Sequence, residues 1–271
     1  MKVNDLKIKL FADGADKDSM LELARKAVVQ AIPNGSNLSQ MTGRVTLAKA
    51  GLGLQATPFI TGFTTNPTLM RKAGVTDYAA FAKDILSEIK DRPISFEVFS
   101  DEFHEMERQA RIINSWADNV YVKIPITNTK RESAFNLVKK LAGEGIKQNV
   151  TAILSLNQVE HILPALGTKT PAIISVFAGR IADTGRDPMP IMKKALEMIK
   201  PYKNVELLWA SPRELLNIVQ ANEIGCHIIT ATPDILKKLD FVGYDLEDFS
   251  LDTVKMFYDD GQKVGYKLYE S

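Results

Sequence analysis

The sequence contains a single cysteine and no apolar run long enough to cross a membrane. The lone Cys226 cannot form an internal disulfide, and scarce cysteine is typical of proteins from a reducing compartment. It lies in the apolar stretch IGCHIITA, so we interpret it as a small core residue. No apolar run approaches the ~20 residues that span a bilayer, and the stretch MKVNDLKIKLFADGAD has no signal-peptide core. We therefore expect a cytoplasmic protein without a membrane-spanning segment.

The sequence also lacks an excess of charge of either sign and lacks clustered histidines. Its 34 Lys and Arg residues balance 33 Asp and Glu residues, so no global field favours nucleic acid or an acidic membrane surface. The three histidines are isolated from one another, without the H-x-H or H-x-x-x-H spacing of a metal site. We expect no nucleic-acid partner and no metal.

Short apolar runs rich in Val and Ile alternate with amphipathic stretches along most of the chain. Eight runs are predicted to be strands: Lys7–Asp13, Phe59–Thr65, Ile94–Phe99, Val120–Ile126, Asn149–Ser155, Ala172–Ala178, Val205–Ser211 and Cys226–Thr232. The stretches between them, such as DYAAFAKDILSEIK, place apolar residues three and four positions apart, which indicates helices.

The alternation of strand and helix predicts parallel β/α units. Eight units predict a single (β/α)8 TIM barrel of the α/β class over residues 1–271, with a C-terminal helical extension. An open doubly wound sheet is the alternative, but no G-x-G-x-x-G turn follows the first predicted strand.

One segment departs from this alternation. Residues 32–58, IPNGSNLSQMTGRVTLAKAGLGLQATP, are rich in Gly, Ser, Asn, Gln and Thr and have weak periodicity. The segment is longer than the ~2–6 residues of an ordinary loop between a helix and a strand. We predict an inserted, flexible excursion, although GRVTLAK could form an isolated strand. Because the segment precedes a strand, we expect it at the end of the barrel opposite the active site, with no catalytic role.

The C-terminal region LDTVKMFYDDGQKVGYKLYES carries spaced aromatic residues, namely Phe257, Tyr258, Tyr266 and Tyr269. We expect these side chains to pack against the barrel. Covering of the barrel mouth and a subunit contact in a homo-oligomer are the alternatives.

A lysine stands in the middle of one predicted strand, at Lys123 in NVYVKIPIT. Lysine is seldom buried unless it is paired, and a buried amine often becomes neutral and therefore nucleophilic. On its own, a salt-bridged lysine is the better interpretation. However, Asp13 and Glu97 also lie near the ends of their strands, and strand ends meet at the active-site face of a barrel. An amine attended by carboxylates that move protons is what imine chemistry on a carbonyl requires.

Two arginines follow later strands of the predicted barrel. Arg180 lies just beyond the sixth strand, and Ser211 and Arg213 lie where the seventh strand ends and a helix begins. The planar guanidinium fits phosphate geometry, and barrels often bind phosphate in their last βα loops. We therefore predict a phosphate site here.

Seven motifs then give a family resemblance: FADGAD (Phe11–Asp16), GFTTNPTLM (Gly62–Met70), FEVFSD (Phe96–Asp101), VYVKIPIT (Val120–Thr127), NVTAILS (Asn149–Ser155), SVFAGRI (Ser175–Ile181) and ASPREL (Ala210–Leu215). In these motifs and their order, the chain resembles the transaldolases, which are Schiff-base enzymes with a (β/α)8 barrel. The resemblance spans most of the chain, and residues 32–58 resemble an insertion into the family pattern.

The resemblance implies roles for individual residues. Lys123 would form an imine with C2 of a ketose phosphate, and Asp13 would remove the C4 hydroxyl proton so that the C3–C4 bond breaks. Glu97 and Thr151 would hold a water that assists imine formation. The substrate hydroxyls would be bound by Asn66, Thr65, Asn149 and Ser175, and the phosphate by Arg180, Ser211 and Arg213. Such chemistry needs no cofactor, and the partners would be small sugar phosphates.

The resemblance also bears on the type of reaction. Transaldolases pass the three-carbon unit to an aldose phosphate in the pentose phosphate pathway, whereas related fructose 6-phosphate aldolases release it to water. The aldolase pattern has Gln and Tyr at the positions where this chain has Glu97 and Phe177. In these two residues the chain resembles the transaldolases, so transfer is the preferred interpretation. An aldolase of that type, a sugar-tailoring Schiff-base aldolase and a non-catalytic sugar-phosphate binding protein are the alternatives.

Overall fold

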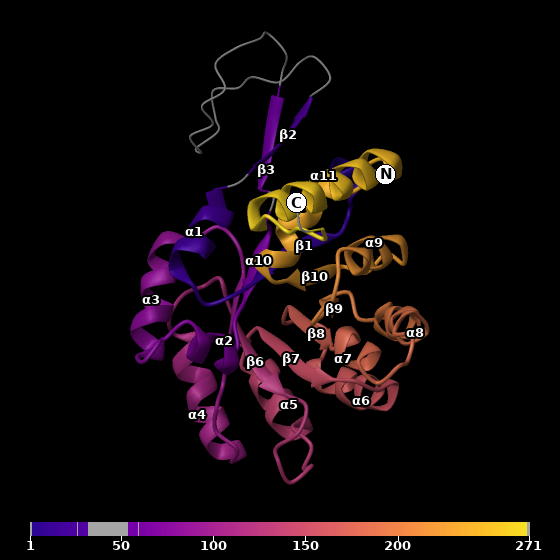
Figure 1. Cartoon of the computed structure of the whole chain (residues 1–271). Coiled ribbons are helices and arrows are strands. Elements are labelled where there is room, and N and C mark those ends of the chain that lie inside the picture. Colours follow the sequence, from indigo (N-terminus) through magenta and orange to yellow (C-terminus); the bar gives the residue numbers. More distant parts are fainter. Residues whose placement is uncertain (1, 26, 32–53, 59, 270–271) are drawn as a thin grey trace.

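The computed structural model describes residues 2–25, 27–31, 54–58 and 60–269. Eight parallel strands form a closed barrel (Figure 1). In chain order they are β1 (Lys9–Asp13), β4 (Gly62–Thr64), β5 (Ile94–Glu97), β6 (Val120–Pro125), β7 (Gln148–Ile153), β8 (Ala172–Val176), β9 (Val205–Trp209) and β10 (Ile228–Ala231). Strand β10 pairs with β1 and closes the ring. The eight predicted strands and the predicted (β/α)8 barrel are confirmed.

Helices follow the strands and form the outer layer (Figure 1). They are α1 (Lys17–Arg25), α2 (Pro67–Lys72), α3 (Tyr78–Glu88), α4 (Phe103–Asn114), α5 (Phe135–Gly143), α6 (Leu156–Ile162), α7 (Ala178–Ala182), α8 (Met189–Ile199), α9 (Leu216–Glu223), α10 (Pro233–Leu236) and α11 (Leu246–Val264). Short 3₁₀ turns occupy η1 (Val3–Asp5), η3 (Leu163–Leu166) and η4 (Lys237–Phe241). Within the described residues, no helix has the length and apolarity that a bilayer span requires.

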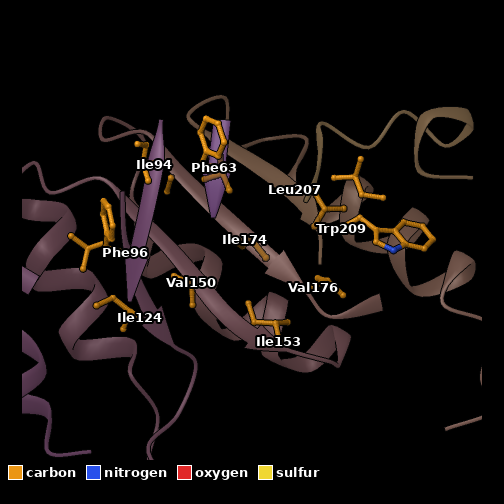
Figure 2. Packing of buried hydrophobic residues seen from close by; sticks show 14 of the residues in the cluster. Phe63, Ile94, Phe96, Ile124, Val150, Ile153, Ile174, Val176, Leu207 and Trp209 are labelled. Carbon is orange, nitrogen blue, oxygen red and sulfur yellow. The ribbon is translucent and has the colours of Figure 1, made fainter. Parts of the chain in front are cut away.

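The strands bury apolar residues on their outer face, against the helices. Successive strand residues point to opposite faces, and the outward ones join one large core with the helices. Figure 2 shows members of this core from strands β4 to β9, including Phe63, Phe96, Ile124, Val150, Ile174 and Trp209. This layer fixes the barrel and hence the positions of its inward-pointing residues.

The alternate strand residues form the barrel interior in two layers. The layer nearer the strand starts is apolar and contains Phe11, Ile173, Leu208 and Ile228, which pack together as a second cluster. Two residues after Phe11, Ile173 and Ile228, at the C-terminal ends of their strands, stand the polar residues Asp13, Ser175 and Thr230. A purely structural barrel interior would continue with Val, Ile and Leu, so the polar layer marks a site.

Two further strands lie outside the barrel. Strands β2 (Ala27–Ala31) and β3 (Leu54–Pro58) form an antiparallel pair that projects away from the barrel (Figure 1). Of the segment predicted as irregular, residues 54–58 form β3, which that prediction missed, and residues 32–53 lie outside the described residues. The candidate strand GRVTLAK lies outside the described residues. That this segment is an insertion stays a prediction.

The C-terminal extension is present as α11, which confirms a helix there. Every residue of α11 is exposed or half-buried, and its side chains Phe257 and Tyr258 are both 66% exposed. Tyr266 and Tyr269 beyond it are exposed as well. The prediction that these aromatics pack against the barrel is therefore wrong. The spacing of these aromatics indicates an apolar helix face, but it does not indicate which surface would cover that face. A homo-oligomer stays a prediction.

Candidate active site

A cavity of 510 Å³ lies at the C-terminal ends of the strands, where the polar interior layer stands. Ten of the twelve predicted site residues line it: Asp13, Asn66, Glu97, Lys123, Thr151, Ser175, Phe177, Arg180, Ser211 and Arg213. They come from seven of the eight strands or from the segments that directly follow them, which include helix α7 for Arg180. The barrel geometry therefore brings together side chains that are up to 200 positions apart in the sequence.

Lys123 is buried in this cavity, and its amine has two partners. The Nζ atom lies 3.0 Å from Oε2 of Glu97 and donates a hydrogen bond to the carbonyl oxygen of Thr65 at 2.8 Å. Glu97 stands directly opposite Lys123 in the register of β5 and β6. A buried ammonium group needs a partner of opposite charge, and Glu97 supplies it. Lys123 is thus both salt-bridged and part of the cavity, so the two interpretations of this lysine do not exclude each other.

Asp13 ends β1 on another side of the cavity. Its Oδ1 accepts a hydrogen bond from the hydroxyl of Thr64 at 2.8 Å. The Thr64 hydroxyl also contacts that of Thr230 at 2.5 Å. Because Thr64 gives its only proton to Asp13, Thr230 must donate to Thr64. The sequence shows these threonines at strand ends, but their link to Asp13 was not predicted.

Burial raises the pKa of the Asp13 carboxyl above its ordinary value, against the opposing effects of the Lys123 charge and the Thr64 hydrogen bond. A carboxyl group with a raised pKa exchanges its proton closer to neutral pH, which suits an acid/base residue.

Thr151 lines the cavity next to an irregularity in β7. The pairing of β7 with β8 shifts register between Val150 and Ile153, and Ala152 has a positive φ of 61°. A bulge of this kind redirects side chains and is common near active sites. The Thr151 hydroxyl is buried and has no hydrogen-bond partner among the described residues. It is available to a substrate or a water.

Asn66 combines a capping role with a place on the cavity wall. Its Oδ1 accepts a hydrogen bond from the backbone N–H of Leu69 at 3.0 Å and so caps α2. Since the carbonyl end of the amide is used by the cap, its NH₂ group is the end left to donate to a ligand.

The structure does not bring the other two predicted residues, Thr65 and Asn149, to the cavity wall. Thr65 donates its hydroxyl proton to the carbonyl of Ser95 at 2.9 Å. Asn149 is fully buried, accepts from Ser175 at 2.6 Å and donates to Ser95 Oγ at 3.1 Å. Their contacts instead orient neighbours: Thr65 supplies a carbonyl to Lys123, and Asn149 fixes the Ser175 hydroxyl.

Tyr78, at the start of α3, supports Glu97 and was not predicted. Its hydroxyl accepts from the backbone N–H of Glu97 at 2.8 Å and donates to the Glu97 carbonyl at 3.0 Å. Burial raises the pKa of this phenol far above its ordinary value, so the hydroxyl stays protonated. One tyrosine in an amphipathic helix gives no sequence signal for such a role.

The predicted phosphate residues lie together at one side of the cavity. Ser211 has a positive φ of 60°, and the loop it begins passes directly over α7. A Cβ atom at Gly179 of α7 would lie 1.5 Å from the Ser211 carbonyl oxygen, so only glycine permits this approach. Arg180 lies over the ring of Phe177, with 6.0 Å between Cζ and the ring centroid. Arg213 forms a bidentate ion pair with Asp183, which was not predicted.

Among the described residues, no group of three or more His, Cys, Asp or Glu side chains could hold a metal ion. Six charged side chains line the cavity. Two are the carboxylates of Asp13 and Glu97, and four are basic: Lys72, Lys123, Arg180 and Arg213. This arrangement offers an amine, two carboxylates for proton transfer and a cationic end for an anionic substrate group.

Comparison with known proteins places this geometry in a family. The family model "Transaldolase/Fructose-6-phosphate aldolase" matches residues 41–268. "Probable transaldolase" of Dehalococcoides mccartyi is 34% identical over 199 residues, which cover 73% of this chain and 87% of that protein. "Probable transaldolase" of a Thermoanaerobacter species is 34% identical over 210 residues, which cover 77% of this chain and 90% of the relative.

"Probable transaldolase 2" of Listeria monocytogenes is 38% identical over 181 residues, which cover 66% of this chain and 78% of that protein. Asp13 precedes the matched span of the family model, so geometry alone places it at the site. With most of its length matched, the chain belongs to the transaldolase/fructose-6-phosphate aldolase family.

Proposed function

We propose that this protein is a transaldolase, which transfers a dihydroxyacetone unit from a ketose phosphate to an aldose phosphate. The donor is sedoheptulose 7-phosphate or fructose 6-phosphate, and the setting is the pentose phosphate pathway in the cytoplasm. The observation that carries the proposal is the buried amine of Lys123, 3.0 Å from the Glu97 carboxylate, in a cavity that also contains Asp13 and two arginines.

The first step is imine formation at Lys123. The amine must lose a proton before it can attack the C2 carbonyl of the ketose, and Glu97 is the base in contact with it. After the attack, one proton moves from the nitrogen to the former carbonyl oxygen and gives a carbinolamine. Its hydroxyl leaves as water when it takes up a second proton. Glu97 returns the proton directly or through a water held with the Thr151 hydroxyl, which lines the same cavity and is buried without a partner among the described residues.

The second step is cleavage. Asp13 takes the proton of the C4 hydroxyl, the C4–O electrons form an aldehyde, and the C3–C4 bond breaks. Its electrons move into the imine and give an enamine on Lys123. The aldose phosphate leaves, the acceptor aldehyde enters, and the same steps in reverse form the new C–C bond and return the proton. The raised pKa of Asp13 favours both directions of this transfer.

The remaining cavity residues bind the substrate. Asn66 donates to a hydroxyl of the three-carbon unit, and Ser175, whose own proton goes to Asn149, accepts from another. Asn149 and Thr65 act through the contacts described above. Arg180, Ser211 and Arg213 bind the phosphate, so that the sugar extends between the arginines and Lys123. In transfer, the enamine must persist until an acceptor aldehyde binds. A proton donor near the enamine would protonate it and lead to release instead. Phe177 lines the cavity without a hydroxyl that could do so.

Two measurements test the proposal. Borohydride with fructose 6-phosphate should reduce the imine and add the mass of the trapped sugar fragment to the peptide containing Lys123. Lys123→Met should abolish this addition and turnover while the circular dichroism spectrum is retained. Lys147→Met, which removes a half-buried amine just before the start of β7, outside the cavity, is the matched control. Trapping that persists in Lys123→Met would refute the imine.

The type of reaction follows from glyceraldehyde 3-phosphate release, measured with and without erythrose 4-phosphate. Release that depends on the acceptor establishes transfer. Release without it would identify an aldolase. A protein that binds phosphate but shows neither release nor trapping would be a sugar-phosphate binding protein.

A further inference from the structure

We propose that Asp183 is a positioning residue that orients Arg213 for phosphate and thereby makes the site favour phosphorylated sugars. The inference deepens the proposed function and rests on its phosphate site. Asp183 follows α7 directly and does not line the cavity, so it acts through Arg213.

The contact between the two side chains is bidentate. Arg213 Nε donates to Oδ1 of Asp183 at 2.9 Å, and Nη2 donates to Oδ2. A guanidinium group has five N–H donors in one plane, so two are engaged and three remain. The remaining donors are the two of Nη1 and one of Nη2, and they lie on the edge away from Asp183. The pair thus fixes which edge of the guanidinium is presented to a ligand.

The backbone on both sides of this pair is also held. The N–H of Arg213 donates to Oδ1 of Asn217 at 2.8 Å. The N–H of Asp183 donates to the carbonyl of Gly179 at 3.0 Å, and Gly179 is the residue over which the Ser211 loop passes. Asp183, Gly179 and the Ser211–Arg213 loop therefore form one connected unit, and the Asp183–Arg213 pair joins its two chain segments through side chains.

The ion pair does little for stability, which favours a functional interpretation. The side chain of Arg213 is 45% exposed and that of Asp183 is 50% exposed, and pairs as exposed as this contribute little to folding. An arginine this exposed samples many rotamers unless it is held. Arg180, the second predicted phosphate ligand, has no ion pair among the described residues. Of the two arginines of the site, only Arg213 is therefore held by a carboxylate.

A carboxylate beside a phosphate site has two opposing effects. The hydrogen bonds of Arg213 hold the pKa of Asp183 below its ordinary value, so Asp183 is ionised near neutral pH and repels a phosphate. Solvent screens that repulsion at an exposed position, whereas the loss of orientation is not screened. We therefore expect the orientation of Arg213 to outweigh the repulsion. Substitution of Asp183 should weaken phosphate binding if orientation dominates and strengthen it if repulsion dominates.

The experiment compares Asp183→Ala, Asp183→Asn and the control Glu197→Gln, which removes an exposed acid from a surface ion pair with Lys194. The dissociation constant of inorganic phosphate is measured by calorimetry on the free protein, and kcat and KM are measured with fructose 6-phosphate and with unphosphorylated fructose. Asp183→Ala should raise the phosphate dissociation constant and the KM for fructose 6-phosphate on the order of tenfold, with kcat and the rate on fructose little changed. Asp183→Asn, which keeps an oxygen acceptor for Nε, should recover part of the loss, and Glu197→Gln should resemble the wild type.

Tighter phosphate binding in both Asp183 variants would overturn the proposal and make Asp183 only a neutralising charge. Unchanged phosphate binding, or a wild type that binds no phosphate, would overturn it too. The phosphate titration needs no catalysis. If Lys123 is not trapped but the titration depends on Asp183 as expected, the transaldolase proposal fails and the positioning role stands.

Discussion

Lys123 and Glu97 stand opposite each other in the register of β5 and β6, and their charged groups meet at 3.0 Å inside the cavity. A pair formed by register is fixed by the barrel itself, because neither residue can move along its strand. The proposed nucleophile and the proposed base are thus placed by the backbone hydrogen bonds that join β5 to β6.

The first prediction concerns this pair. Glu97→Gln removes the base that contacts Lys123, so the rate of imine formation should fall by about 10²–10⁴, the usual contribution of such a group. Rapid mixing followed by borohydride quenching measures that rate. An unchanged rate would assign the proton transfer to another residue.

The second prediction concerns the fate of the enamine. Glu97→Gln combined with Phe177→Tyr gives the pair that the family resemblance associates with aldolases. We expect this double variant to release glyceraldehyde 3-phosphate without an acceptor, at a larger fraction of its transfer rate than the wild type. A partition that does not change would show that other residues decide between transfer and release.

The third prediction separates cleavage from imine formation. In Asp13→Asn, the C4 hydroxyl loses its proton acceptor, so C–C cleavage should slow by about 10²–10⁴. The intact six-carbon sugar should then accumulate as an imine, and mass spectrometry after borohydride reduction should find it on Lys123. If the three-carbon fragment is found at the wild-type rate, Asp13 is not the acid/base residue.

The same substitution should change stability with a defined dependence on pH. Burial raises the folded-state pKa of Asp13 above 3.8, so the folded state holds this proton more tightly than the unfolded state. Its contribution to stability is present at low pH and is lost as pH rises through the folded-state pKa. Asp13→Asn avoids that loss. Its Tm should exceed that of the wild type near neutral pH, and the difference should shrink on acidification; a difference that grows on acidification would contradict the burial argument.

The fourth prediction concerns Tyr78. Tyr78→Phe removes the group that satisfies both backbone polar atoms of Glu97, so unfolding should become easier by about 1–3 kcal/mol, and imine formation should slow because Glu97 is less well held. Tyr121→Phe is the control, since no hydrogen bond of the Tyr121 hydroxyl is found among the described residues. Denaturant unfolding measures both variants, and equal effects would mean that the Tyr78 hydroxyl contributes nothing specific.

The fifth prediction concerns the phosphate loop. Gly179→Ala places a methyl group 1.5 Å from the Ser211 carbonyl, so the loop must shift. The KM for phosphorylated substrates should rise, and Tm should fall. Gly143→Ala, at the end of α5, meets nothing within 4 Å and should leave both quantities near wild type. Equal KM values would place the loop outside the phosphate site.

The barrel could be predicted because its strands are buried on both faces and therefore appear as short apolar runs. The cavity residues could be predicted because the C-terminal ends of parallel strands meet at one face. Thr65 was misplaced for a reason visible in the sequence: Thr64 points inward, so the next residue must point outward. Asn149 points inward but lies one layer below the cavity, and strand alternation does not report depth.

The contacts of Tyr78 and Asp183 could not be predicted, since each depends on where a helix end meets a strand or loop far away in the sequence. The strands β2 and β3 were missed because each is short and pairs with a partner that is distant in the sequence. AVVQA before residue 32 continues the apolar pattern of α1, and its partner begins 23 positions after it ends.

That hairpin has a practical consequence. Ala27 pairs with Pro58, so the chain leaves the barrel and returns to it at neighbouring points. Ala31 pairs with Leu54 at the other end of the two strands, and an insert between two positions that already lie together costs little closure entropy. The β2–β3 connection is therefore where a reporter domain or an affinity tag can be spliced into this enzyme while both termini stay free.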